Sequence, residues 1–99
     1  MAKYYLTKKA VEDLNGIWRY TYENWSEKQA DIYYHVLLKG FNEVANYPDL
    51  GKVYNLILPN LRGMQWKEHI IFYRRLKEGE IEILRILHRR MDLKTRIQE

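Results

Sequence analysis

The chain is 99 residues long, which suits one domain with one hydrophobic core, and the absence of cysteine excludes disulfide bonds and thiolate chemistry. Its net charge of +4 at pH 7 is carried by residues 62–99, which hold 10 Lys and Arg against 6 Asp and Glu, whereas residues 1–61 hold 7 of each. No apolar run approaches the ~20 residues that span a bilayer and no signal peptide is recognisable, so we expect one cytoplasmic domain over residues 1–99, without a membrane partner.

The first half of the chain predicts a strand followed by two helices. Lys3–Leu6 is a short β-forming run, and Thr7 stands at the position of a helix N-cap. Apolar residues then recur every three to four positions to about Asn24. Ser26 begins a second stripe of this kind, which ends near Asn46, before a turn that contains Pro and Gly. The connection between the stripes is so short that the two helices should form an antiparallel hairpin.

After the helices, the spacing of apolar residues changes to that of β-strands. Three runs rich in β-forming residues follow, over 60–66, 68–76 and 80–88. The dipeptide Glu78-Gly79 between the last two runs suits a two-residue hairpin turn. The order predicts an α+β fold, written β-α-α-β-β-β, in which the helix hairpin packs on a small, mainly antiparallel sheet.

The hairpin turn also predicts which residues face each other. The expected cross-strand pairs are Arg75 with Glu82, Phe72 with Arg85, and His69 with His88. The last strand is apolar on both faces, with Ile81, Ile83 and Leu87 expected on one face and Leu84 and Ile86 on the other. We therefore expect a central strand that the helices cover on one face and that is partly covered on the other.

Motifs for enzymatic chemistry are absent from the sequence. There is no Gly-rich phosphate loop, HExxH or GxSxG motif. His69 and His88 would lie roughly 5 Å apart as cross-strand neighbours, but no suitable third ligand is near them, so we expect no metal, no cofactor and no catalytic residue. Arg85 inside a strand must find an acceptor or open onto solvent, and it is either a structural anchor or a binding group.

The helices hold more aromatic residues than one buried stripe can accommodate. Most of them should belong to the core, but any that remain exposed would form a surface on which a partner's peptide or helix docks. The aromatic residues of this region are Trp18, Tyr20, Tyr22, Trp25, Tyr33, Tyr34, Phe41 and Tyr47.

Several blocks of the sequence together resemble one family. The run Ile71-Phe72-Tyr73 is followed at a fixed distance by Ile86-Leu87-His88 and then by Met91-Asp92. With the upstream blocks LTKKAVEDLNGIWRYT, WSEKQADIYY and YPDLGK, these runs are similar to the ParE branch of the RelE/ParE superfamily of bacterial toxin–antitoxin systems. The resemblance spans nearly the whole chain. It implies the β-α-α-β-β-β fold and a toxin that inhibits DNA gyrase by binding, without small-molecule substrate or enzymatic activity, and that a ParD-like antitoxin neutralises.

Candidate contact residues follow from combining this resemblance with the charge and aromatic patterns. The basic part of the chain would bind gyrase, or gyrase in complex with DNA. The residues expected there are Arg85, His88, Arg89, Arg90 and Arg62, with Lys94 and Arg96 as weaker candidates. The residues expected to bind the antitoxin are Trp18, Tyr22, Tyr33 and Tyr34.

Two alternatives remain from the same superfamily. RelE-like members cleave messenger RNA on the ribosome, and Glu68, His69, Arg85 and His88 are the residues that would form such a nuclease site here. This chain departs from the YoeB-like pattern, because Ile70 stands where those relatives have an arginine and because its His88 is followed by arginine in place of tyrosine. The other alternative is a relative that binds an antitoxin and is not toxic.

Overall fold

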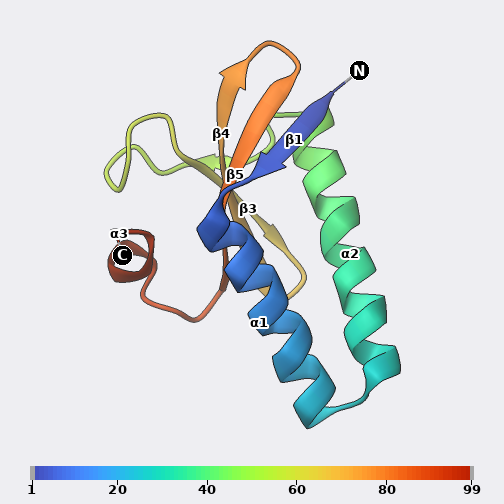
Figure 1. Cartoon of the computed structure of the whole chain (residues 1–99). Helices are drawn as coiled ribbons and strands as arrows, with labels where there is room; N and C mark the ends of the chain where they lie inside the picture. Colours follow the sequence, from blue (N-terminus) through green and yellow to red (C-terminus); the bar gives the residue numbers. More distant parts are fainter. Residues whose placement is uncertain (1, 99) are drawn as a thin grey trace.

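The computed structural model describes residues 2–98 and shows a helix hairpin packed on one face of a five-stranded sheet (Figure 1). The elements are β1 (Lys3–Leu6), α1 (Lys8–Asn24), α2 (Glu27–Asn46), β2 (Lys52–Val53), β3 (Arg62–Trp66), β4 (His69–Lys77), β5 (Glu80–His88) and α3 (Leu93–Gln98). The strands lie in the order β1-β5-β4-β3-β2, with β1 parallel to β5 and the other pairs antiparallel. The predicted α+β class and helix hairpin are confirmed. Two short elements, β2 and α3, were not predicted.

Local sequence signals account for where the two long helices begin. The hydroxyl of Thr7 accepts a hydrogen bond from the backbone N–H of Ala10 at 3.0 Å, and the hydroxyl of Ser26 accepts one from the N–H of Gln29 at 3.0 Å. Each bond satisfies one of the N–H groups that a helix start leaves without an internal partner. Both predicted N-caps are therefore confirmed. Thr7 also donates to the carbonyl of Leu84 at 2.8 Å, so the start of α1 is attached to β5.

Helix α2 lies close against the sheet at Gly40. A Cβ atom at this position would lie 2.7 Å from Cδ1 of Ile71 and 2.8 Å from Cγ of Trp66, which is closer than side chains tolerate. The indole N–H of Trp66 donates to the carbonyl of Val36 at 2.7 Å, one turn earlier in α2. These contacts set the distance between α2 and the strands β3 and β4. They thereby also position Tyr33, which lies near the start of the same helix.

Each face of the sheet carries a hydrophobic cluster. The larger cluster joins the helices to the sheet and contains Ala10, Leu14, Leu37, Phe41, Val44, Ala45, Ile71, Tyr73, Ile81, Ile83 and Ile86. The smaller cluster on the opposite face contains Leu61, Ile70, Phe72 and Leu87, packed with Tyr54, Ile57, Leu58, Leu84 and Ile97. Each fully buried Leu or Ile side chain contributes roughly 1.5–3 kcal/mol. Among the described residues, those outside the sheet that pack on the second face lie in the segment before β3 and in α3, as expected for a sheet that is partly covered on that side.

The β4–β5 hairpin closes through the predicted turn. Lys77 pairs with Glu80, and Gly79 adopts a φ of 79°, which glycine reaches without steric cost. Two of the predicted cross-strand pairs, Phe72 with Arg85 and His69 with His88, are observed.

The third predicted pair is wrong, because the register of the β4–β5 hairpin shifts twice. Glu82 faces Arg74 and not Arg75, since the register shifts between Lys77 and Arg75, where Leu76 is the extra residue of β4. It shifts back between Tyr73 and Phe72, where Leu84 is the extra residue of β5. An extra residue on one strand changes the face to which the following side chains point.

The bulge at Leu84 also changes the faces on which the following residues of β5 lie. Ile86 lies in the helix-facing cluster with Ile81 and Ile83, whereas Leu87 lies with Leu84 in the cluster on the opposite face. A strict alternation places Ile86 and Leu87 the other way round, so the predicted faces were wrong beyond the bulge. The residues of β5 after the bulge are those that border the candidate site described next.

Candidate functional site

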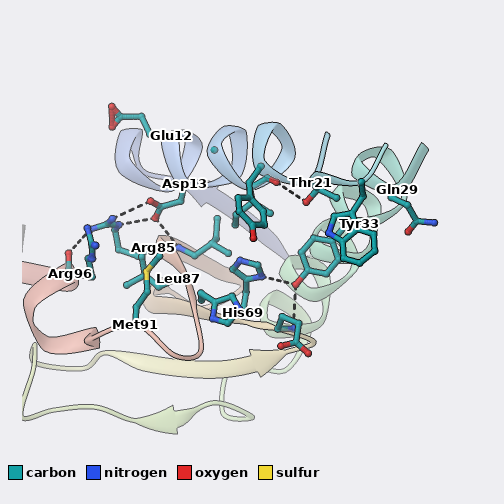
Figure 2. A pocket seen from close by; sticks show the side chains of 17 residues that line it. Glu12, Asp13, Thr21, Gln29, Tyr33, His69, Arg85, Leu87, Met91 and Arg96 are labelled. Carbon is teal, nitrogen blue, oxygen red and sulfur yellow. Dashed lines mark hydrogen bonds and ion pairs between the residues drawn. The ribbon is translucent and has the colours of Figure 1, made fainter. Parts of the chain in front are cut away.

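A groove of about 730 Å³ lies between α1 and the second half of β5. The groove exists because β1 pairs with β5 only as far as Ile83. Beyond Ile83, β5 is paired with β4 on one side and has α1 in place of a strand on the other. The groove is lined by α1, by the start of α2, by the first residues of β4, by the second half of β5 and by the segment that follows (Figure 2). It therefore combines residues that lie far apart in the chain.

Arg85 and Asp13 form one wall of the groove. The Arg85 Nε and Nη2 atoms donate to the two carboxylate oxygens of Asp13 at 2.8 and 3.1 Å, and both side chains are largely buried. The same carboxylate accepts the backbone N–H of Ile86 at 3.0 Å, and Arg85 Nη1 donates to the carbonyl of Arg96 (Figure 2). Arg85 thus holds α1, β5 and α3 together as a structural anchor. A contact between Arg85 and the target stays a prediction.

His69, His88 and Tyr33 form the floor of the groove. The Tyr33 hydroxyl lies 2.6 Å from Nδ1 of His69, and the His69 and His88 rings meet edge to face with centroids 5.3 Å apart. Burial, with the neighbouring His88 as a second cause, lowers the pKa of His69 to about 4, so this ring is neutral at pH 7.

Tyr33 is hydrogen-bonded both to the ring of His69 and to the backbone of Glu68. Burial raises the pKa of Tyr33, so its hydroxyl keeps its hydrogen at neutral pH. The hydroxyl oxygen accepts the backbone N–H of Glu68 at 3.3 Å, and the same hydroxyl is hydrogen-bonded to Nδ1 of His69 at 2.6 Å. Tyr33 ties α2 to the start of β4 by these two bonds.

The exposed end of β5 carries the cationic residues that the sequence singled out. Arg89 Nε donates to Glu68 Oε2 at 2.9 Å, and this hydrogen bond, together with the positive charge of Arg89, lowers the pKa of Glu68. Arg90 is exposed and its backbone N–H donates to Nδ1 of His88 at 3.2 Å. His88, Arg89 and Arg90 therefore lie together beside the groove, whose lining includes His88.

The remaining predicted target residues are divided. Arg96 lines the groove, whereas Arg62 lines a separate pocket with Arg75 and Lys77. The side chain of Lys94 lies outside the part of the chain that the structure describes. The structure thus separates Arg62 from the cationic end of β5.

The four aromatic residues predicted to bind an antitoxin lie on two surfaces, and none is fully buried. Trp18 and Tyr22 stack with centroids 5.3 Å apart, and the Trp18 indole donates to Asp31 of α2 at 2.9 Å. Tyr33 lines the groove, whereas Trp18, Tyr22 and Tyr34 do not. The predicted set is therefore not one continuous binding surface.

Three residues that matter for the groove were not assigned to it from the sequence. Tyr20 and Trp25 line it and are 66% and 76% exposed. The spacing of Asp13, Gly16 and Tyr20 places these residues on one helix face and is the signal that points to Tyr20. Nothing in the sequence pairs Asp13 with Arg85, which follows 72 residues later. Among residues 2–98, no group of three or more His, Cys, Asp or Glu is placed to hold a metal ion.

Comparison with known proteins identifies the family. A family model described as "ParE toxin of type II toxin-antitoxin system, parDE" matches residues 4–93. The chain is 35% identical over 92 residues to Toxin ParE1 of Mycobacterium tuberculosis, which covers 93% of this chain and 94% of that protein. It is 33% identical over 99 residues to Toxin ParE of Escherichia coli, with 100% and 96% covered.

A solved structure shares the fold. It is titled "Chromosomal ParDE TA system from P. aeruginosa" and matches with a TM-score of 0.74 and 21% identity, over 89% of this chain and 96% of that chain. In residues 2–98, no helix combines the length and hydropathy of a membrane span. Together with the matched sequence blocks, these likenesses show that the chain belongs to the ParE toxin family of type II toxin–antitoxin systems.

Proposed function

We propose that this ParE toxin acts in the cytoplasm by binding DNA gyrase and stopping its turnover, without covalent chemistry of its own. The observation that carries the proposal lies at the end of β5, where the half-buried His88 lines the groove and the exposed cations Arg89 and Arg90 follow it directly. Clustered cationic side chains of this kind favour association with an acidic partner surface. The whole chain, residues 1–99, acts as one domain, and inhibition by binding needs no cofactor.

The contacts inside the groove support binding over catalysis. The Arg85 guanidinium is neutralised by Asp13, and the His69 ring is neutral and hydrogen-bonded to Tyr33. A ribonuclease of the RelE kind needs a free cationic group at the phosphate and a group that exchanges protons near neutral pH. Neither Arg85 nor His69 is in that state here.

The helix hairpin is the proposed docking region for a ParD-like antitoxin. The stacked pair Trp18 and Tyr22 offers partly exposed aromatic area on one side, and Tyr33 offers the groove on the other. An antitoxin segment that folds on binding reaches both surfaces when it wraps around the hairpin. Tyr34 lies half-buried on α2 and extends the aromatic area of that helix.

Two assays on the purified chain separate the possible activities. One measures supercoiling of relaxed plasmid by gyrase, and the other measures cleavage of messenger RNA on translating ribosomes. We expect loss of supercoiling with intact transcripts, and restored supercoiling when the cognate antitoxin is added. Site-specific transcript cleavage with normal supercoiling would show a RelE-like nuclease. No effect in either assay, with antitoxin binding retained, would show a non-toxic relative.

A further inference from the structure

A second pocket, of about 400 Å³, is lined by residues of the loop that follows α2, of β2 and the segment before β3, and of the strands β3 and β4. Arg62, Arg75 and Lys77 line it together with Asp49 and the hydroxyl-bearing ring of Tyr73. The strand register explains the convergence. Arg62 pairs with Tyr73, so the two share a face, and Arg75 lies two residues further along the same face of β4.

Two guanidinium groups meet at one carboxylate oxygen in this pocket. Arg62 Nη2 and Arg75 Nη2 lie 3.7 and 3.6 Å from the same Oδ1 atom of Asp49. Both distances exceed that of a good hydrogen bond, and the Asp49 side chain is 79% exposed. A single carboxylate oxygen shared by two guanidinium groups at these distances therefore neutralises the two arginines only loosely.

The surroundings of the two arginines are more rigid than Asp49 itself. Arg62 Nη1 donates to the carbonyl of Gly51 at 2.8 Å, which orients the guanidinium. The Tyr73 hydroxyl accepts the N–H of Gly51 at 2.8 Å and donates to the carbonyl of Pro48 at 2.7 Å, so it fixes the loop on both sides of Asp49. The pocket is thus preorganised, whereas its carboxylate is free to swing into solvent.

We propose that this pocket binds a phosphate group of the DNA backbone, and that the carboxylate of Asp49 holds the place of that phosphate in the free toxin. A phosphate offers several oxygens to two guanidiniums at once and suits their planar donor groups better than one carboxylate oxygen does. Lys77 adds a third cation at the rim, partly neutralised by Glu80 at 3.6 Å. The site is open, with Arg75 and Lys77 53% and 72% exposed, which fits a ligand that continues outside the pocket, as a polymer does.

The choice of DNA as the source of the phosphate rests on the proposed function, in which gyrase acts on DNA. Binding is therefore measured without gyrase, by fluorescence anisotropy of a short labelled DNA duplex over a series of salt concentrations. The test variant is Arg75→Gln. Arg74→Gln is the matched control, because Arg74 is the adjacent arginine on the opposite face of β4 and pairs with Glu82. Asp49→Asn is the third variant, and thermal melting checks that all three remain folded.

If the pocket binds a DNA phosphate, the three variants should differ in DNA affinity. Arg75→Gln should weaken DNA binding about threefold to tenfold and lower the slope of log affinity against log salt by about 0.9, the value for one lost phosphate contact. Arg74→Gln should leave both quantities nearly unchanged. Asp49→Asn should strengthen binding, because it removes the internal competitor.

The DNA-phosphate site would be overturned if the folded chain did not bind DNA, if Arg74→Gln and Arg75→Gln had equal effects, or if Asp49→Asn bound DNA more weakly. It would also be overturned if inorganic phosphate displaced DNA at the concentration of DNA phosphate, because the pocket would then be a site for the free anion. The supercoiling assay on the same samples keeps the two proposals apart. Supercoiling inhibition without DNA binding overturns only the phosphate site, and DNA binding without supercoiling inhibition overturns only gyrase as the target.

Discussion

The carboxylate of Asp13 on α1 takes the place of a neighbouring strand for the second half of β5. It accepts the backbone N–H of Ile86 at 3.0 Å and both Nε and Nη2 of Arg85. The parallel partner β1 ends opposite Ile83, so this carboxylate satisfies an N–H group at a sheet edge that would otherwise be open. One ion pair thereby closes the sheet, attaches α1 and forms a wall of the groove.

Removal of one partner of this pair should destabilise the fold strongly. Asp13→Ala leaves the Arg85 charge largely buried and the Ile86 N–H without an acceptor, and we expect the free energy of unfolding to fall by about 2–4 kcal/mol. Urea denaturation measures this change. Glu68→Ala is the control, because it breaks the exposed pair with Arg89 and should have a much smaller effect. Equal losses in the two variants would contradict the anchoring role of Asp13.

Charge reversal at the end of β5 should separate toxicity from folding. Arg89→Glu with Arg90→Glu changes two exposed side chains, so the free energy of unfolding should change by less than about 0.5 kcal/mol apart from the lost contact with Glu68. Growth inhibition and supercoiling inhibition should fall sharply, and residual target binding should weaken as salt rises.

The matched control for this variant is Lys8→Glu with Lys9→Glu, an equal change of charge at exposed positions at the start of α1. It should keep full toxicity. Antitoxin binding should survive in both double variants. A folded Arg89→Glu, Arg90→Glu protein with full toxicity would show that the target contacts a different surface.

Truncation of the stacked aromatic pair should weaken antitoxin binding. Trp18→Ala or Tyr22→Ala removes partly exposed aromatic area from the hairpin, and loss of a binding anchor typically costs 2 kcal/mol or more, about a thirtyfold loss of affinity. Isothermal titration with the antitoxin measures the effect. Tyr47→Ala removes another exposed tyrosine beyond the end of α2 and should leave the affinity unchanged. If Trp18→Ala and Tyr22→Ala bind as tightly as the native toxin, this pair is not the docking surface.

The groove surface requires its own test. Tyr20→Ala and Trp25→Ala truncate side chains that are mostly exposed and line the groove, so both proteins should remain folded. If the antitoxin wraps around the hairpin, each variant should lose affinity as Trp18→Ala does. A loss confined to the Trp18 and Tyr22 side would restrict the antitoxin to that face.

The stability of the toxin should fall below pH 6.5 because of His69. Its folded-state pKa of about 4 lies below the ordinary value of 6.5, so the unfolded chain binds more protons in this range and stability decreases as pH falls from about 6.5 to about 4. We expect a loss on the order of 1–3 kcal/mol, limited by the partial exposure of the ring.

Urea denaturation at several pH values checks this expectation. His69→Gln should flatten the dependence between pH 6.5 and 4. His35→Gln should preserve it, because His35 lies exposed on α2, away from the groove. Identical pH profiles for the native toxin and His69→Gln would show that His69 does not titrate in this way.

Features that depend on a few neighbouring residues were predictable from the sequence. The N-caps at Thr7 and Ser26 and the turn at Glu78-Gly79 were predicted correctly, because each is a contact within about one turn of chain. The matched sequence blocks also indicated the ParE family, because each block is a run of neighbouring residues. The order of the elements read from the spacing of apolar residues agrees with that family's fold.

The faces and partners that these elements present depend on tertiary packing and could not be predicted. The bulge at Leu84 reversed the predicted positions of Ile86 and Leu87, and it arises from the fit between two strands. The pairing of Asp13 with Arg85 brings together residues that lie 72 positions apart. Burial, charge neutralisation and exposure depend on such distant contacts, so the sequence named cationic and aromatic candidates, and packing determined which of them share a surface.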